Sequence, residues 1–207
     1  MKKLMLMGIA ILLLILLFSV AGEAVELNNL VTLPTADVMT YQGAVGGEIT
    51  PDKKEVELAY KLDSRLEVGG VLNLYDNSYE IGPLVKLAMT PETKNQPAIS
   101  AGIKNRDMYL VFSKTLKYGF RGHMGIGNGK YEDLFIGINK IINPVTVELS
   151  DGHKNNNSPS FPPMNLMAEY VDDAINLGVR MNLKKSYYVD IGIMDLNEIK
   201  AGFSFAF

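Results

Sequence analysis

The sequence contains no cysteine and no tryptophan, and its two histidines are His123 and His153. Without cysteine the chain has no disulfide bonds, no thiolate chemistry, no zinc–cysteine site and no lipid-modified N-terminal cysteine. Two histidines are too few for a multi-histidine metal centre. We therefore expect neither a metal nor a cofactor.

An excess of positive charge is also lacking, because 20 Lys and Arg residues stand against 23 Asp and Glu residues in a chain of 207. The formal net charge of −3 provides no basic surface for nucleic acid, so no nucleic-acid partner is expected. The length suits one domain of ordinary size.

Long hydrophobic runs are confined to the N-terminus. Lys2 and Lys3 precede the apolar stretch 4–18, and small residues follow it. This order is typical of a Sec-type signal peptide, which we expect to be cleaved after Ala24, with Ala21 as an alternative site. The other interpretation is an uncleaved membrane anchor. No later stretch approaches the ~20 apolar residues of a membrane helix, so the mature chain can cross a membrane only as strands.

From residue 43 onward the hydrophobic pattern has period two, and turn signals recur every ~8–12 residues. Short polar turns join antiparallel neighbours, so the pattern predicts an all-β, antiparallel up-and-down barrel of about twelve strands. The expected strands are 43–50, 55–62, 66–75, 79–89, 97–104, 108–116, 119–127, 134–142, 165–171, 175–183, 187–195 and 199–207.

The expected organisation is a signal peptide at 1–24, an irregular periplasmic segment at 25–42 and an outer-membrane barrel at 43–207, with 143–163 as an inserted loop. Pro34 interrupts the irregular segment, which lacks a long period of either kind. We expect this segment to fold into the periplasmic mouth and to help close the lumen.

The two faces of the strands differ in a way that favours a transmembrane barrel over a soluble one. The apolar face runs ~9–11 residues per strand with hardly a charge, which suits a tilted crossing of the bilayer. The polar face mixes glycine with balanced charges, which suits a crowded lumen in which charges pair. The residues predicted to line the lumen are Glu55, Glu57, Lys61, Glu67, Glu80, Lys86, Lys104, Arg121, His123, Glu169, Arg180, Asp190 and Lys200.

The C-terminal strand carries Phe203, Phe205 and Phe207 at alternate positions. This ending resembles the assembly signal of outer-membrane barrel proteins, which implies the barrel-assembly machinery and outer-membrane lipid as partners. Tyrosines near strand ends are candidates for interfacial aromatic girdles. These are Tyr75, Tyr79, Tyr131 and Tyr187.

Residues 28–49 contain Pro34-Thr35-Ala36, a short spacer, Gly43 and the first strand. This order resembles the start of the YjbH-like outer-membrane barrel family, and segments 64–73, 109–116 and 166–183 resemble that family's strand pattern. The resemblance implies a location in the cell envelope and envelope polysaccharide as a candidate partner. Lipoprotein members of the family carry an N-terminal cysteine, which this chain lacks.

No segment predicts catalysis. His123 faces the predicted lumen, but a catalytic base needs a nucleophile and an orienting group within reach, and the sequence places neither beside it. The stretch 125–129 lacks the GK[ST] end of a phosphate loop, and 151–158 lacks the ligand spacing of a calcium loop. We expect a non-enzymatic outer-membrane barrel that is structural or a narrow channel for small polar solutes or glycan. The alternatives are a soluble periplasmic β-barrel binding protein and an envelope enzyme with its site at the barrel rim.

Overall fold

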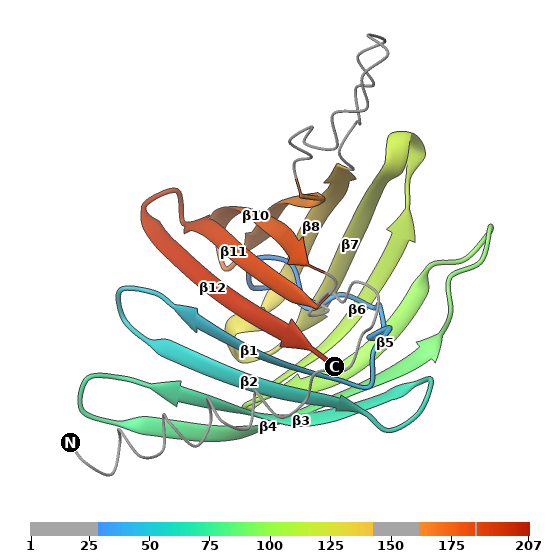
Figure 1. Ribbon diagram of the computed structural model, residues 1–207. Coiled ribbons are helices and arrows are strands. Elements are labelled where there is room, and N and C mark those ends of the chain that lie inside the picture. Colours follow the sequence, from blue (N-terminus) through green and yellow to red (C-terminus); the bar gives the residue numbers. More distant parts are fainter. Residues whose placement is uncertain (1–28, 143–161, 185) are drawn as a thin grey trace, which may run out of the picture.

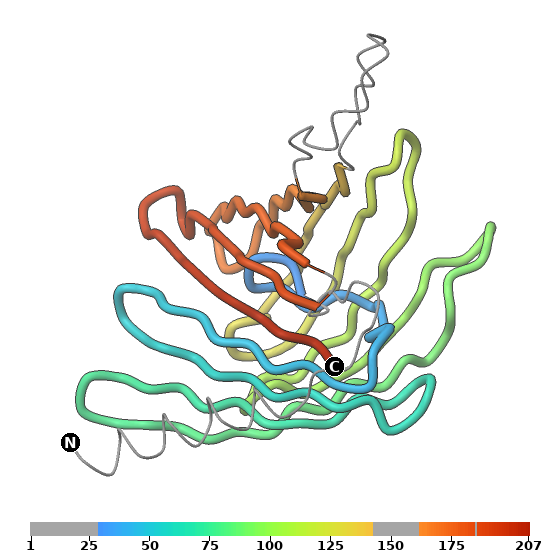
Figure 2. Tube along the Cα trace, viewed as in Figure 1, coloured from blue at the N-terminus to red at the C-terminus, as the bar shows by residue number. Residues whose placement is uncertain are grey.

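The computed structural model describes residues 29–142, 162–184 and 186–207, and they form one closed β-barrel (Figures 1 and 2). Each strand pairs antiparallel with its neighbours in sequence, and the first strand pairs with the last. The strands are β1 (Gly43–Ile49), β2 (Lys54–Lys61), β3 (Leu66–Leu74), β4 (Tyr79–Thr90), β5 (Ala98–Lys104), β6 (Asp107–Thr115), β7 (Phe120–Gly127), β8 (Asp133–Ile142), β9 (Met164–Val171), β10 (Ala174–Lys184), β11 (Tyr187–Met194) and β12 (Glu198–Ala206). The predicted fold class is confirmed, and each observed strand end lies within one residue of its predicted position.

The predicted signal peptide and residues 143–161 of the expected inserted loop lie outside the described residues. Within the described part of the chain, no helix has the length and apolar character needed to span a membrane. Two single-turn 3-10 helices, Lys117–Gly119 and Gly129–Tyr131, interrupt the connections before β7 and β8.

Tight turns close the hairpins between late strands. Asp172 and Asp173, which join β9 to β10, have φ values of 50° and 58°. Asp195 and Leu196, between β11 and β12, have φ values of 47° and 52°. Two consecutive residues with positive φ match the right-handed twist of the flanking strands, which is why such turns are favoured in two-residue hairpin loops. The short polar turns seen in the sequence therefore set the register of these hairpins.

The seam between β1 and β12 closes the barrel. The start of β1 and the end of β12 meet at the same end of the barrel. The Gly43 backbone N–H donates to the Phe207 carbonyl at 2.9 Å, and the Phe207 N–H donates back to the Gly43 carbonyl at 2.8 Å. We call this end the terminal end. The opposite end, which holds the β1–β2 turn at 50–53, is the far end.

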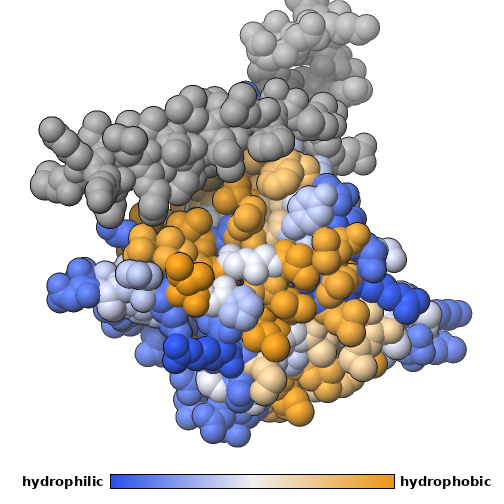
Figure 3. Space-filling view, turned by 90° about the horizontal axis from the view of Figure 1, so that it is seen from below, coloured by the Kyte–Doolittle hydropathy of each residue, from blue (hydrophilic) through white to orange (hydrophobic). Residues whose placement is uncertain are grey.

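The outer surface of the barrel is apolar along its middle. Large hydrophobic side chains on this surface are between 38% and 72% exposed, and they alternate along the strands with buried residues. They include Leu58, Ile81, Met124, Ile126, Ile136, Ile138, Leu166, Leu177, Ile191 and Ile193. Figure 3 shows hydrophobic side chains gathered in the middle of the face seen from below Figure 1, with hydrophilic side chains toward its sides.

Exposed aromatic rings lie near both ends of the strands. Tyr75 and Tyr79 flank the β3–β4 turn at the far end, and Tyr187 lies at the terminal end. The prediction for Tyr131 is wrong, because this ring is 1% exposed and packs inside the barrel at 5.4 Å from the ring of Tyr109. Its position in a turn resembles that of an interfacial aromatic, but the helical turn at Gly129–Tyr131 directs the ring inward.

The aromatic residues of the C-terminal strand form a ring cluster at the terminal end. The Phe205 ring lies 4.9 Å from that of Tyr187 and 6.2 Å from that of Phe207, and Phe205 is 5% exposed. Phe203 remains 45% exposed on the outer surface.

Candidate functional site

The lumen holds the segment that precedes β1. Residues 29–42, which we call the plug, lie inside the barrel, where the blue segment is drawn in Figures 1 and 2. The side chains of Leu30, Val31, Leu33 and Ala36 are at most 4% exposed and pack with inward-facing wall residues. We expected the segment 25–42 at the mouth, but its described part extends through the lumen.

A carboxylate of the wall binds the plug near the far end. Glu169 on β9 accepts hydrogen bonds from the backbone N–H groups of Thr32, at 2.9 Å, and Leu33, at 3.1 Å. The Thr32 hydroxyl and the Asn176 amide also donate to this carboxylate. A buried carboxylate needs such partners, and here the plug backbone supplies them.

Other polar side chains of the wall hold the rest of the plug. The Ala36 N–H donates to Ser113 Oγ at 2.8 Å, and the Ala36 carbonyl accepts from Ser100 Oγ at 2.8 Å. Toward the terminal end, Glu67 accepts from the Met39 N–H, and Lys61 Nζ donates to the Met39 carbonyl at 2.9 Å. The plug backbone thus bonds to opposite walls along the length of the barrel, so it is a specifically docked element.

Glycines of the wall make room for the apolar plug residues. A Cβ atom at Gly178 would lie 2.7 Å from Val31 Cγ2, and one at Gly192 would lie 3.0 Å from Val31 Cγ1. The Leu30 side chain likewise occupies the place of a Cβ at Gly137. The glycines that suggested a crowded lumen in the sequence therefore mark where the plug seats.

A second group of glycines accommodates aromatic rings across the strands. Tyr109 covers Gly102, Phe135 covers Gly125 and Tyr131 covers Gly127. These rings fill the part of the lumen beside β5–β8, with the Tyr131 and Phe135 centroids 5.8 Å apart. The sequence pattern did not predict these inward-facing aromatics, although Tyr109 directly opposes Gly102 and Phe135 directly opposes Gly125 in the strand pairing.

The structure places the thirteen charged and polar residues predicted to line the lumen in three settings. Seven are at most 5% exposed: Glu55, Glu67, Lys86, His123, Glu169, Arg180 and Lys200. Five are partly buried and face the lumen: Glu57, Lys61, Lys104, Arg121 and Asp190. Glu80 instead lies at the mouth of the far end, where it pairs with the exposed Arg106 at 3.3 Å.

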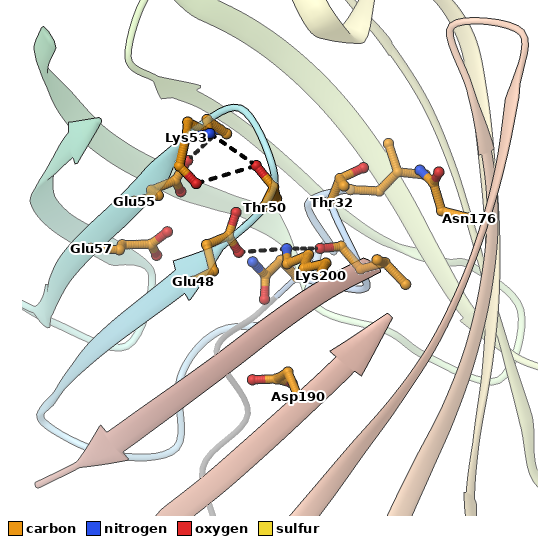
Figure 4. Close-up of polar contacts among 12 residues, drawn as sticks. Thr32, Glu48, Thr50, Lys53, Glu55, Glu57, Asn176, Asp190 and Lys200 are labelled. Carbon is orange, nitrogen blue, oxygen red and sulfur yellow. Dashed lines mark hydrogen bonds and ion pairs between the residues drawn. The ribbon is translucent and has the colours of Figure 1, made fainter. Parts of the chain in front are cut away.

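The inward charges pair with one another. Lys104 Nζ lies 2.7 Å from Glu55 and 2.6 Å from Glu57, and Lys86 lies 3.8 Å from Glu67. Arg180 pairs with Asp190, and Lys200 pairs with Glu48 at 2.5 Å. Arg180 and Lys200 also bond to plug atoms, Asn29 and the Val31 carbonyl. Figure 4 shows Lys200 between Glu48 and the plug. Pairing offsets the cost of placing these charges inside the barrel.

One arginine ties the plug to a loop at the terminal end. Arg121 on β7 donates through Nε to Asp37 Oδ2 at 2.8 Å and through a terminal nitrogen to Asp37 Oδ1, so it binds the plug carboxylate with two bonds. Its other terminal nitrogen donates to Glu92 in the β4–β5 loop. Burial raises the pKa of Glu92, but the hydrogen bonds from Arg121 and Thr115 outweigh it and lower the pKa to about 2. We call this triplet of Asp37, Arg121 and Glu92 the latch.

His123 belongs to a chain of buried hydrogen bonds. Ser113 Oγ lies 2.7 Å from His123 Nδ1, His123 Nε2 lies 2.8 Å from Asn139 Oδ1, and Asn139 donates to Asn165 at 2.8 Å. Every group in the chain has a suitable partner when the neutral imidazole carries its proton on Nε2. Ser113 then donates to Nδ1, and Nε2 donates to Asn139. Ser113 Oγ then accepts from the plug at Ala36, and Ser113 is 1% exposed. The chain anchors the plug and leaves the hydroxyl no access to a substrate.

Spaces beside the plug are small. Cavities of about 30 Å³ and 40 Å³ flank it, the first beside Arg180 and Lys200 and the second beside Lys86 and Lys104. Volumes of this size hold water molecules but not a solute. Within the described residues the plug and the paired charges therefore close the lumen.

A larger cavity of about 310 Å³ opens at the far end, above Asn29 and Thr32 of the plug. We call this cavity the vestibule. Turn residues and strand ends line it, and among them are charges of both signs: Glu48, Lys53, Lys104, Lys130, Asp172, Asp195, Glu198 and Lys200. Figure 4 shows Lys53, Thr50 and Glu48 from the β1–β2 hairpin on one side and Thr32 and Asn176 on the other.

No family model and no curated protein matches this sequence. Solved structures do match. The KdgM porin aligns with 80% of this chain and 98% of its own at a TM-score of 0.51 and 10% sequence identity. The outer membrane protein Omp33 of Acinetobacter baumannii aligns at a TM-score of 0.47 and 11% identity, over 81% of this chain and 98% of its own. The KdgM porin in complex with disordered oligogalacturonate aligns at 0.49 and 11% identity, over 80% and 98%. At this identity the similarity to the KdgM porin shows a shared barrel fold.

Proposed function

We propose that this chain is an outer-membrane β-barrel that forms a narrow passage for small polar solutes and is closed at rest by its own plug. The observation that carries the proposal is a closed barrel with an apolar outer surface around a charged interior. An apolar outer surface suits lipid, and a closed sheet leaves no unpaired strand edge in a bilayer. The porin fold of a structural neighbour supports the same assignment.

A passage is favoured over a purely structural role because the closure resides in an element outside the sheet. The plug contributes no strand to the barrel, and hydrogen bonds and ion pairs with polar wall residues hold it in place. Its removal would leave a lumen lined by charged side chains. The resemblance to the YjbH-like family adds a proposal of envelope location with glycan as a candidate solute.

We propose no enzymatic role. The Ser113–His123–Asn139 chain has the residue types of a nucleophilic site, but the plug occupies the serine oxygen. A reacting carbonyl needs space beside the nucleophile and donors for the developing oxyanion. The packing around Ser113 leaves no such space.

Fractionation and conductance test the proposal. The full-length protein should fractionate with the outer membrane as a heat-modifiable band and show little current in planar bilayers. Deletion of 25–42 should retain the heat-modifiable band and produce discrete conductance steps. Large steady currents from the intact protein would contradict closure by the plug. Silence from the folded deletion variant would contradict a passage, and release of the protein into the soluble periplasm would contradict the membrane location.

A further inference from the structure

Charges of opposite sign occupy different arcs of the vestibule. Lys53 in the β1–β2 turn, Lys104 on β5 and Lys130 in the β7–β8 turn form a basic wall. Asp172 in the β9–β10 turn, and Asp195 and Glu198 in and beside the β11–β12 turn, form an acidic wall. The basic wall comes from β1–β8 and their turns, and the acidic wall comes from β9–β12 and their turns. The two remaining vestibule charges, Glu48 on β1 and Lys200 on β12, pair with each other across the seam.

The two walls are not neutralised by each other. Lys53 and Lys104 pair with Glu55 at 2.8 Å and 2.7 Å, but Lys130 has no ion pair among the described residues. Its ammonium lies 4.8 Å from the centre of the Tyr131 ring. Burial and the nearby charges of Lys104 and Lys53 together lower the pKa of Lys130 to about 8, against the opposing effect of the Glu55 and Glu48 carboxylates. An ammonium in this setting gains from an additional negative partner.

The carboxylates of the acidic wall likewise lack ion-pair partners within the described chain. Asp172, Asp195 and Glu198 form no ion pair within the described chain. The lysine beside them, Lys200, already pairs with Glu48 and donates to the Val31 carbonyl. Three carboxylates therefore line the cavity without an ion pair among the described residues, and so does the Lys130 ammonium.

We propose that the vestibule binds a small dipolar solute that carries an ammonium group and a carboxylate, such as a short zwitterionic peptide. The ammonium would contact the acidic wall, and the carboxylate would contact Lys130. The volume of about 310 Å³ lies at the lower end of the range for small-molecule sites, which suits a dipeptide. A polar solute of one charge sign would leave one of the walls unpaired.

This inference rests on the proposed passage for its biological meaning, but it can be tested without conduction. The probe is L-alanyl-L-alanine, titrated calorimetrically into the full-length protein in detergent micelles. The N-acetylated dipeptide lacks the ammonium, and the C-amidated dipeptide lacks the carboxylate. We expect both modified probes to bind roughly fivefold or more weakly than the free dipeptide, as loss of a partly exposed charge contact predicts.

Substitutions assign each end of the probe to its wall. Lys130→Gln should weaken the free dipeptide roughly fivefold but leave the amidated dipeptide unchanged, because that probe has no carboxylate to lose. Glu198→Gln should show the opposite selectivity and leave the N-acetylated probe unchanged. Lys94→Gln, the same substitution as at Lys130 but in the terminal-end β4–β5 loop, is the matched control.

The possible results distinguish failure of the proposed dipolar site from failure of the proposed passage. Absence of calorimetric binding by a heat-modifiable, folded protein overturns the dipolar site and leaves the plugged passage standing. Equal weakening of all three probes by Lys130→Gln also overturns it, because that result indicates a general loss of the cavity. Selective loss at each end supports the site even where the conductance experiment fails.

Discussion

At the residue scale, the glycines of the wall decide whether the lumen can hold the plug. Gly178 and Gly192 face Val31 at distances where a side chain has no room. Their period-two placement on the polar face was visible in the sequence and indicated crowding. The sequence could not show that the occupant is the chain's own Val31, because that contact joins segments far apart in sequence without any strand pairing.

Substitution of Gly178 by valine should therefore displace the plug while keeping the barrel. The new Cβ would meet Val31 Cγ2 at 2.7 Å and Met167 Cε at 3.3 Å, and the plug is the more easily moved neighbour because it is outside the sheet. We expect discrete planar-bilayer currents from Gly178→Val. Gly47→Ala is the control, since its Cβ would lie 3.6 Å from the Glu55 carbonyl oxygen, an ordinary contact. Currents equal to those of the unmodified protein would contradict this role of Gly178.

The latch also belongs to the residue scale, and its pH response follows from Glu92. A carboxyl whose folded pKa is lowered to about 2 contributes stability above its ordinary pKa of 4.5 and loses that contribution only as the pH falls toward 2. Acidification from pH 7 to pH 5 should therefore leave the Arg121–Glu92 contact and the closed state unchanged. Planar-bilayer recordings of the intact protein at both values test this. Opening at pH 5 that Glu92→Gln reproduces already at pH 7 would show that Glu92 is protonated too early for the latch described.

At the element scale, the hairpins show what period and turn chemistry determine. The strand ends follow from alternation and polar turns, and they agree with the sequence to within one residue. Tyr131 shows the limit of that reasoning, because a single turn of 3-10 helix reverses the direction of its ring. The ion-pair partners Asp37 and Glu92 of Arg121 were likewise not predicted, since both lie in irregular segments that carry no period.

The β11–β12 turn offers a test of turn chemistry. Leu196 adopts a φ of 52° and is 59% exposed, so its side chain contributes little packing and carries the strain of the left-handed region. Leu196→Gly should relieve that strain and stabilise the hairpin by about 1 kcal/mol, less the entropy that glycine adds to the unfolded chain. Urea unfolding followed by loss of the heat-modifiable band measures the change. A clear decrease in the midpoint would show that Leu196 makes a contact that outweighs its backbone strain.

At the scale of the whole molecule, the apolar belt requires a membrane. Ile138 lies at mid-strand on β8 and is 38% exposed, so arginine there should reduce insertion by ~2–4 kcal/mol. Leu196→Arg places the same charge in the β11–β12 turn, outside the belt, and should insert normally. The yield of heat-modifiable barrel in outer-membrane fractions compares the two. Equal yields would mean that the belt does not face lipid.

The two ends of the barrel carry connections of different length. The far-end connections are 50–53, 75–78, 105–106, 128–132, 172–173 and 195–197, whereas the terminal-end connections are 62–65, 91–97, 116–119, 143–163 and 185–186. The expected assembly signal of the C-terminal strand ends at Phe207 at the terminal end, which we therefore expect to face the periplasm, so the far end should face the cell exterior. This orientation places the short turns outside, the reverse of the usual arrangement in transmembrane barrels. The longest connection then lies on the periplasmic side together with Phe207, whereas the plug begins at Asn29 at the outer end of the lumen.

The absence of cysteine makes this orientation directly measurable. Asn77→Cys in the far-end β3–β4 turn should react with a membrane-impermeant maleimide on intact cells. Asn95→Cys in the terminal-end β4–β5 loop should react only after the outer membrane is permeabilised. The reverse labelling pattern would invert the orientation and place the vestibule in the periplasm.

The β1–β12 seam constrains the order in which the molecule folds. Its strands are the first and last of the barrel, so their pairing has the greatest loop-closure cost and should form late. The plug directly precedes β1 and bonds to β9 and β12, which are synthesised well after it. A finished barrel would have to be threaded, whereas an open sheet can curl around the segment. In the intact protein, docking of the plug and the final strand pairing should therefore occur as one kinetic event.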